Sequence, residues 1–165
     1  MFDFFRKGAS MTKKITGIAK MKGAPAVNPR PLRKITRVGT FHDGDKPVAS
    51  LLLEVSSDDG SRSRGLMGRD SVPEIYGMLF EGLSGGGNFW MKDCLVPIDV
   101  AFMKKDGTVT KTYSMPVDKD GKDRYPYDDD DTMAVEVAGG LLEKLGIGDG
   151  AVLKTRELSK ETDNG

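Results

Sequence analysis

The segment NFWMKDCLVPIDVAF, residues 88–102, contains both the only tryptophan and the only cysteine of this 165-residue chain. A lysine and an aspartate stand between them, so a cation and a carboxylate interrupt an otherwise apolar stretch. Two arginines flank a second apolar stretch about twenty-five residues upstream. The residues that could do chemistry together are Arg64, Arg69, Trp90, Lys92, Asp93 and Asp99. We call them the polar cluster.

Two interpretations of the polar cluster are open. Arginine side chains form forked hydrogen bonds to carboxylates and phosphates, and an indole ring offers a stacking face, which together indicate an anion or carbohydrate site. Alternatively, Arg64 or Arg69 pairs with an aspartate and fastens a short helix to a sheet, because buried charges need partners. Side-chain alternation along a strand would place residues 89, 91 and 93 on one face and residues 90, 92 and 94 on the other. Lys92 and Asp93 should then not pair with each other.

Several kinds of catalysis are excluded within the main domain. The only histidine, His42, lies in the N-terminal part, so the domain has no imidazole for a Ser-His-Asp or Cys-His nucleophile or for a typical zinc site. SGGGN, residues 84–88, lacks the helix that a phosphate-binding loop requires. An acid–base enzyme built on Asp93 and Asp99 is the least favoured hypothesis, because the sequence cannot place them as a pair. We expect a protein without catalytic activity and without a cofactor.

The sulfur-containing residues are expected to fill the core. Met67, Met78 and Met91 could form a thioether site for a soft metal near Phe80, but methionines more often fill irregular gaps between other apolar side chains. Lys92 could lower the pKa of the Cys94 thiol, but with no base or second cysteine nearby a buried structural thiol is the better prediction.

An acidic loop, residues 116–131, contains DKDGKD followed by DDDD. An EF-hand loop would need glycine at its sixth position and glutamate at its twelfth, whereas Gly121 is at the fourth. The loop is therefore expected to be solvated, although it could instead meet the basic arm of a neighbouring molecule. The weak candidates for calcium ligands are Asp118, Asp120 and Asp123.

The remaining pattern predicts a mostly β, compact, partly closed barrel-like domain with short helices. Strands are expected over residues 48–55, 76–83, 89–95 and 132–138, with a last strand after Gly146. Asp106-Gly107 predicts a hairpin between the arms IDVAFM and TVTKTYSM. Ser61 is the expected N-cap of a short helix that ends at Gly68.

The N-terminal part of the chain is strongly basic. Residues 1–48 carry 11 Lys and Arg against 3 Asp and Glu, and three prolines within residues 25–31 prevent a continuous helix there. We therefore predict an extended basic arm over residues 1–47, a domain over residues 48–156 and a polar tail over residues 157–165. An arm of this charge suits an acidic partner, a protein subunit or nucleic acid. Its candidate partner-binding residues are Lys13, Lys14, Arg30, Arg33, Lys34 and Arg37.

The motifs RGLMGR, GMLF, FWMKDC, PIDVAF and AVEVAGGLLEKLGIGDGAVL occur in one order and spacing. In this they resemble domain-of-unknown-function family 192, small proteins of bacteria, archaea and some phages, over roughly residues 50–154. The resemblance implies a compact β-rich fold and no established activity. After Trp-Met-Lys the family pattern has Asn-Thr where this chain has Asp93-Cys94, and an ionised aspartate cannot donate a hydrogen bond as asparagine does.

Two function hypotheses follow from these observations. The first is a non-catalytic assembly module, an arm-tethered structural subunit of a larger particle such as a phage virion. The second is a small-ligand, carbohydrate or anion-binding protein that uses the polar cluster. The N-terminus does not have the pattern of a secretory signal and no apolar run is long enough to span a membrane, so we expect a cytoplasmic protein or one incorporated into a virion.

Overall fold

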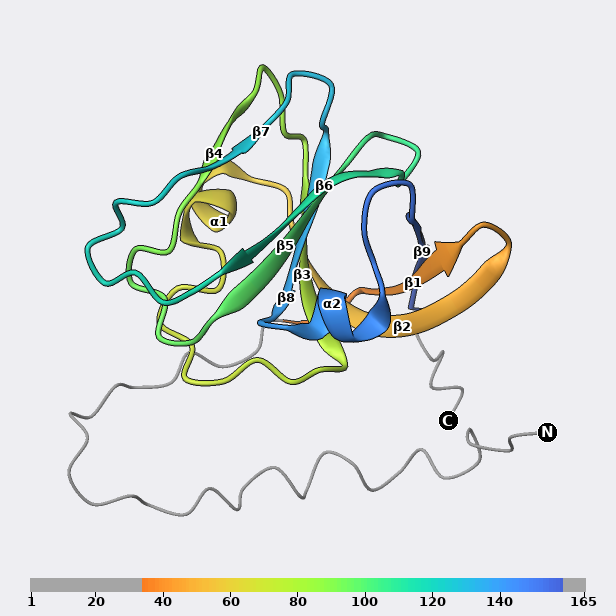
Figure 1. The fold of residues 1–165 in the computed structure, drawn as a ribbon, viewed down its shortest axis with the longest axis horizontal. Coiled ribbons are helices and arrows are strands. Elements are labelled where there is room, and N and C mark those ends of the chain that lie inside the picture. The colour runs from red at the N-terminus through yellow and green to blue at the C-terminus, as the bar shows by residue number, and fades with distance from the viewer. Residues whose placement is uncertain (1–33, 159–165) are drawn as a thin grey trace, which may run out of the picture.

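The computed structural model describes residues 34–158, which form a seven-stranded sheet, a two-stranded sheet and two short helices (Figure 1). The strands are β1 Arg37–Asp43, β2 Lys46–Ser56, β3 Tyr76–Glu81, β4 Gly87–Phe89, β5 Ile98–Met103, β6 Val109–Met115, β7 Tyr125–Tyr127, β8 Met133–Ala138 and β9 Val152–Glu157. The helices are α1 Asp59–Arg64 and α2 Leu141–Leu145. The prediction of a mostly β domain with short helices is confirmed.

The large sheet has the strand order β6-β5-β8-β3-β2-β1-β9. Its pairs are antiparallel except for β2 and β3, which run parallel and are joined by a crossover that contains α1. Thr108, just before edge strand β6, forms an isolated bridge with Val152 on the other edge strand, β9, so the sheet curls without closing. The predicted β5–β6 hairpin is present. Its turn requires a glycine at position 107, because φ there is +86° and a Cβ would lie only 2.2 Å from the Leu153 carbonyl oxygen.

Side chains alternate between the two faces of the large sheet, and a hydrophobic cluster packs against each face. On one face, Leu53, Leu79 and Val135 pack with residues of α2 and β9. On the other, Met78 and Phe102 pack beneath α1 and the β4–β7 pair. Figure 1 shows α1 and β4–β7 on the opposite side of β3, β5 and β8 from β1 and β9. We call the face that packs against α2 the α2 face, and the face beneath α1 the α1 face.

The domain begins earlier than the sequence predicted. Strand β1 lies inside the interval 1–47 that was predicted to be an arm, yet it pairs with β2 along one side and with β9 along the other. Its Phe41 is completely buried on the α2 face. The boundary at residue 47 is therefore wrong, because β1 is an internal strand of the sheet. The expectation that the domain has no imidazole is wrong as well, since His42 lies on this strand.

Of the six residues predicted to bind a partner through the arm, two lie within the described part of the chain and four lie outside it. Arg37 belongs to β1 and forms an ion pair with Glu81 inside the domain. Lys34 is exposed immediately before that strand. Lys13, Lys14, Arg30 and Arg33 lie outside the described residues, as does most of the predicted tail.

Two local predictions also need correction. The strand expected over residues 89–95 stops at Phe89, where β4 ends, and the chain then turns. Helix α1 is capped by Asp58 rather than Ser61, and it ends at Gly65 rather than Gly68. Asp58 and Ser61 form a capping box, in which each side chain accepts a hydrogen bond from the other residue's backbone N–H.

Deleting residues 1–46 is expected to abolish folding of the domain, because it removes β1 from between β2 and β9. The substitution Phe41→Ala is expected to lower the free energy of unfolding by roughly 3–5 kcal/mol. The conservative exchange Thr40→Ser, at a half-exposed position of the same strand, should change it by no more than about 0.5 kcal/mol. Urea denaturation followed by circular dichroism measures the free energy of unfolding of all three variants. An intact, cooperative transition in the deletion variant would restore the arm boundary at residue 47.

Candidate binding site

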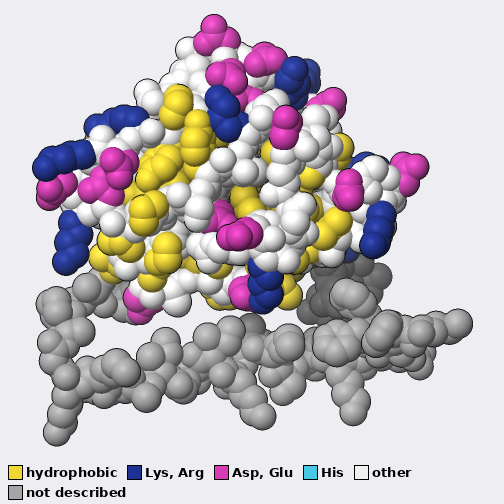
Figure 2. Space-filling model, viewed as in Figure 1, with side chains coloured by type: hydrophobic (Ala, Val, Ile, Leu, Met, Phe, Trp, Pro, Cys, Tyr) yellow, Lys and Arg dark blue, Asp and Glu magenta, His cyan; other side chains and the backbone are white. Residues whose placement is uncertain are grey.

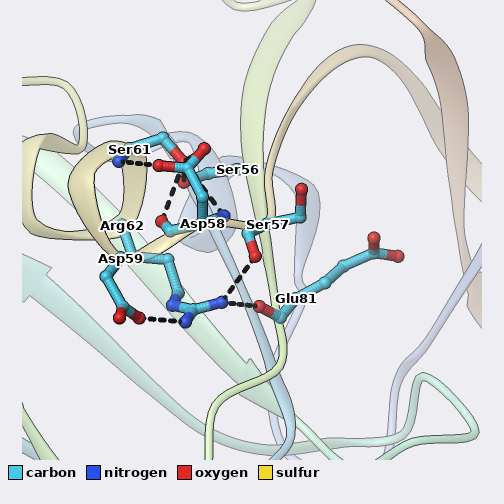
Figure 3. A network of polar contacts seen from close by, with 7 residues as sticks. All are labelled: Ser56, Ser57, Asp58, Asp59, Ser61, Arg62 and Glu81. Carbon is cyan, nitrogen blue, oxygen red and sulfur yellow. Dashed lines mark hydrogen bonds and ion pairs between the residues drawn. The ribbon is translucent and has the colours of Figure 1, made fainter.

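Helix α1 is fixed to the edge of the α1 face by a polar network (Figure 3). Ser56 at the end of β2 donates to the buried Ser61 hydroxyl at 2.9 Å. The guanidinium of Arg62 donates to the carbonyl oxygens of Ser57 and Glu81 at 2.9 and 2.8 Å, and it pairs with Asp59 in its own helix. These contacts tie the short helix to the ends of both β2 and β3.

The loop after α1 is held against the sheet by a buried ion pair. Arg69 Nη2 lies 2.7 Å from Glu54 Oε2 on β2, and both side chains are 2% exposed. The Tyr76 hydroxyl donates to the same carboxylate, and the Arg69 guanidinium lies 5.2 Å from the centre of the Tyr76 ring. Burial together with the hydrogen bond to Glu54 raises the pKa of Tyr76. Moving the loop away would leave the Glu54 carboxylate buried without its counter-charge, so this ion pair anchors the loop on the α1 face.

A second buried carboxyl group, Glu136 on β8, lies under the start of this loop. Register across the sheet aligns Glu54, Met78 and Glu136 in one row. Glu136 Oε2 accepts a hydrogen bond from the Leu66 backbone N–H at 3.2 Å. Burial raises the pKa of Glu136 from 4.5 to about 7, against the smaller opposing effects of the Leu66 N–H and the Arg69 charge.

A cavity of about 350 Å³ lies between α1, the β4 segment and the sheet, with Glu136 among its lining residues. Its volume is in the range typical of small-molecule sites. In Figure 2, hydrophobic side chains gather on the side of the molecule that carries α1, β4 and β7, and Lys and Arg lie mostly around the outline. Rings form much of the cavity wall: Phe80, Phe89, Trp90 and Tyr127. The polar lining residues are Arg62, Ser63, Arg64, Asn88, Cys94 and Glu136.

Trp90 lies at the border of this cavity and is 39% exposed. Two cations accompany its ring: Lys92 Nζ at 5.6 Å and the Arg124 guanidinium at 5.0 Å from the ring centre. Phe89 packs edge-on against Phe80 and Phe102. Phe89 is half-buried against the cluster on the α1 face and Trp90 is exposed, yet both rings line the same cavity, so the prediction that they point to opposite faces stays a prediction.

The predicted alternation beyond residue 90 is wrong, because the chain turns there. Met91 and Cys94 are both buried, whereas Lys92 and Asp93 are both exposed. Asp93 has φ +58°, a left-handed conformation that aspartate and asparagine tolerate better than most residues. The asparagine of the family pattern would fit this turn equally well. As predicted, Lys92 and Asp93 form no ion pair with each other among the described residues.

The predicted partners of the two arginines are also wrong. Arg69 pairs with Glu54, and the exposed Arg64 at the cavity forms no ion pair with the described aspartates. Asp99 instead lies on the α2 face, where its carboxylate accepts from the Ser114 hydroxyl at 2.9 Å and from the Leu142 N–H at 3.0 Å. Asp99 therefore caps the N-terminal turn of α2, whose own preceding residue, Gly140, provides no side-chain cap.

The sulfur-containing residues pack as expected. Met78, Met91 and Cys94 are buried in the cluster on the α1 face, and Met67 is half-buried against it. Burial, with the nearby Glu136 and Asp93 carboxylates, raises the pKa of the Cys94 thiol to about 12. The thiol is therefore a poor nucleophile at neutral pH.

The acidic loop directs its carboxylates toward its own chain. Asp118 accepts backbone N–H groups of Asp120, Lys122 and Asp123 at 3.2, 2.6 and 2.9 Å, which lowers its pKa. The Asp120 carboxylate pairs with the Lys122 ammonium at 2.9 Å. Within residues 34–158, no group of three His, Cys, Asp or Glu side chains is placed to hold a metal ion.

Two carboxylates that shape the site, Glu54 and Glu136, were not among the predicted site residues. Each stands in an apolar strand, in LLLEV and AVEVA, and this interruption was the available signal. A charged residue within a strand that is buried on both faces needs a partner or a function. Lys92 and Asp93 also interrupt an apolar stretch, but both lie on the surface.

A family model matches residues 40–155, which is more than half of the chain. The chain belongs to the DUF192 family. That family is described only as "Uncharacterized ACR". The predicted resemblance is confirmed, and the match includes part of β1. No curated protein matches the sequence.

Two crystal structures resemble this DUF192 domain. A Sinorhizobium meliloti 1021 protein titled "putative transcription regulator" is 25% identical, with a TM-score of 0.66 over 73% of this chain and 92% of that one. A protein of unknown function from Novosphingobium aromaticivorans DSM 12444 is 23% identical, with a TM-score of 0.68 over 84% and 99% of the two chains. The second likeness concerns the fold alone. Neither described helix is long and apolar enough to cross a membrane.

The substitution Asp99→Ala is expected to destabilise the domain by about 3 kcal/mol, because the Leu142 N–H and the Ser114 hydroxyl would lose a buried acceptor. Asp99→Asn should cost less, since its side-chain oxygen can still accept from Leu142. Thermal unfolding measures both, with the exposed Asp149→Ala as the control. If Asp99→Ala melts like wild type, Asp99 does not cap α2.

Glu136→Gln is expected to change how stability depends on pH. Because the folded-state pKa is raised, the folded protein binds the proton more tightly, so wild-type stability falls as pH rises from about 4.5 to about 7. The free energy involved is on the order of 3 kcal/mol. The glutamine variant should lack this loss and be more stable than wild type at about pH 8. If the unfolding free energies of wild type and Glu136→Gln depend on pH in the same way, the raised pKa does not belong to Glu136.

Proposed function

We propose that this domain binds a small organic molecule in the cavity between α1, the β4 segment and the sheet. The observation that carries the proposal is the Glu136 carboxyl group, 5% exposed, in the lining of a cavity of about 350 Å³ with aromatic walls. A concave space whose walls combine aromatic rings with polar side chains, one of them a carboxyl of perturbed pKa, has the features expected of a ligand site.

The polar cluster contributes to this proposal only in part. Trp90 and Arg64 line the cavity, whereas Arg69 supports it from behind through Glu54. Asp99 belongs to the opposite face of the sheet. Glu136 is the one carboxylate among the described lining residues, so the cavity lacks the paired carboxyl groups of many acid–base enzymes. This favours binding over catalysis.

The assembly hypothesis stays a prediction. It depended on the charge of the arm, and four of its six named cations lie outside the described residues. Of the other two, Arg37 has its charge paired with Glu81 within the domain. The cavity is therefore the better-supported basis for a function.

Trp90, the only tryptophan, provides the assay, because its ring borders the cavity. Probes of about ten non-hydrogen atoms should bind with roughly −3 kcal/mol, a Kd of several millimolar. We expect at least one of three probes, methyl β-glucoside, 2-phenylethanol and 2-phenylethylamine, to change the Trp90 emission saturably. A large side chain in the cavity lining, Ser63→Phe, should abolish that change. Ser71→Phe, at an exposed position outside the lining, should preserve it.

Saturable binding that survives Ser63→Phe would place the ligand elsewhere. Absence of any emission change with all three probes up to tens of millimolar would count against the cavity as a ligand site.

A further inference from the structure

Glu136 differs from the other buried carboxylates of the described residues in how its charge is compensated. Glu54 has both an arginine and a tyrosine hydroxyl. Asp99 and Asp131 each accept two or more hydrogen bonds. Glu136 has one backbone N–H, that of Leu66, and forms no ion pair with any described Lys, Arg or His. A charge buried with so little compensation favours a cationic partner.

The residue that faces this carboxyl group across the cavity wall is a glycine. Gly65, the residue that ends α1, also lines the cavity and has φ +44° and ψ −139°. A Cβ at that position would lie 3.1 Å from Glu136 Oε2 and 3.5 Å from both Glu136 Oε1 and Phe80 Cζ. A side chain there would crowd the carboxyl group. Glycine leaves room for a ligand atom.

The cavity walls favour a cation as well. Phe80, Phe89, Trp90 and Tyr127 all line it, and the faces of aromatic rings attract cations. Trp90 already has two cations near its ring, the Lys92 ammonium and the Arg124 guanidinium, and Arg62 and Arg64 also line the cavity. These charges oppose a further cation at Trp90, so the rings left for a ligand cation are Phe80, Phe89 and Tyr127. A hydroxyl group on a neutral ligand would satisfy a hydrogen bond of Glu136 but leave its charge uncompensated.

We infer that the ligand is an organic amine, whose ammonium group pairs with the Glu136 carboxylate and whose apolar part packs against the aromatic walls. This inference rests on the proposed function, because it names the ligand class for the same cavity. The ammonium would donate one hydrogen bond to the carboxylate and replace the missing counter-charge.

The pH dependence of this binding follows from the groups around Glu136. Burial raises its pKa to about 7, and Arg69 behind the cavity opposes that effect. An alkylammonium remains charged well above pH 7. Affinity should therefore be constant above about pH 7 and fall about tenfold for each further pH unit below it, as protonation of Glu136 competes. The other charged or titratable groups at or near the cavity are Glu54, Arg62, Arg64, Tyr76, Asp93 and Cys94.

The test compares 2-phenylethylamine with 2-phenylethanol, which has the same ring and a neutral end, by the Trp90 emission. At about pH 8, the amine should bind wild type at least about tenfold more tightly than the alcohol. Glu136→Gln should remove that preference, and lowering the pH to about 5 should remove it in wild type. Glu143→Gln, the same exchange at an exposed site on α2, should leave it unchanged. Circular dichroism confirms folding of each variant and at each pH.

The outcomes separate this inference from the proposed function. Equal binding of amine and alcohol, blocked by Ser63→Phe, would overturn the amine and keep the cavity as a ligand site. An amine preference that persists in Glu136→Gln, or that does not change with pH, would also overturn it. If neither probe binds, both the inference and the proposed function fail. Should Glu136→Gln not fold, the wild-type pH dependence alone decides.

Discussion

The buried ion pair between Arg69 and Glu54 is the interaction on which the geometry of the α1 face depends. It anchors the loop after α1 to β2 at a point where neither charge has access to water. Through that anchor, the Leu66 N–H reaches Glu136 and Gly65 lies over the carboxyl group. Breaking the pair would leave a charge buried alone, a cost of several kcal/mol, so the loop has one stable position. The cavity owes its shape to this contact rather than to its own lining.

Much of the fold was predictable from local signals. The Asp106-Gly107 turn, the apolar strands β3, β5 and β8, and the ending of α2 at Gly146 depend on residues close in sequence, which turn geometry and side-chain periodicity describe well. Strand β1 was missed because its seven residues include glycine, histidine and two charged side chains, and because basic residues precede it. Its place between β2 and β9 is decided by partners, one of them more than a hundred residues away, and no local pattern reveals them.

The site was predicted less well than the fold. Trp90 and Arg64 do border the cavity, but the role assigned to Asp93 assumed a strand that ends four residues before it. Asp99 lies on a correctly predicted strand, β5, but on the opposite face of the sheet. A left-handed turn at Asp93 redirects the chain, and alternation cannot be extended through such a turn. Glu54 and Glu136 are aligned through Met78 only once β2, β3 and β8 are in register. Sequence shows that each strand contains a carboxylate; only strand order shows that both lie on one face.

The pairing of β1 with β9 has a consequence for how this chain is made. A ribosome completes β1 and β2 early, but β9 follows only after 95 intervening residues, several seconds later at usual synthesis rates. Until then, the outer edge of β1 presents unpaired backbone groups to any other nascent chain nearby. The charges of Arg37 and Asp43 at the two ends of this strand are of the kind that discourages such association. The outer edge of β1 is protected from pairing with another chain only once β9 has paired with it.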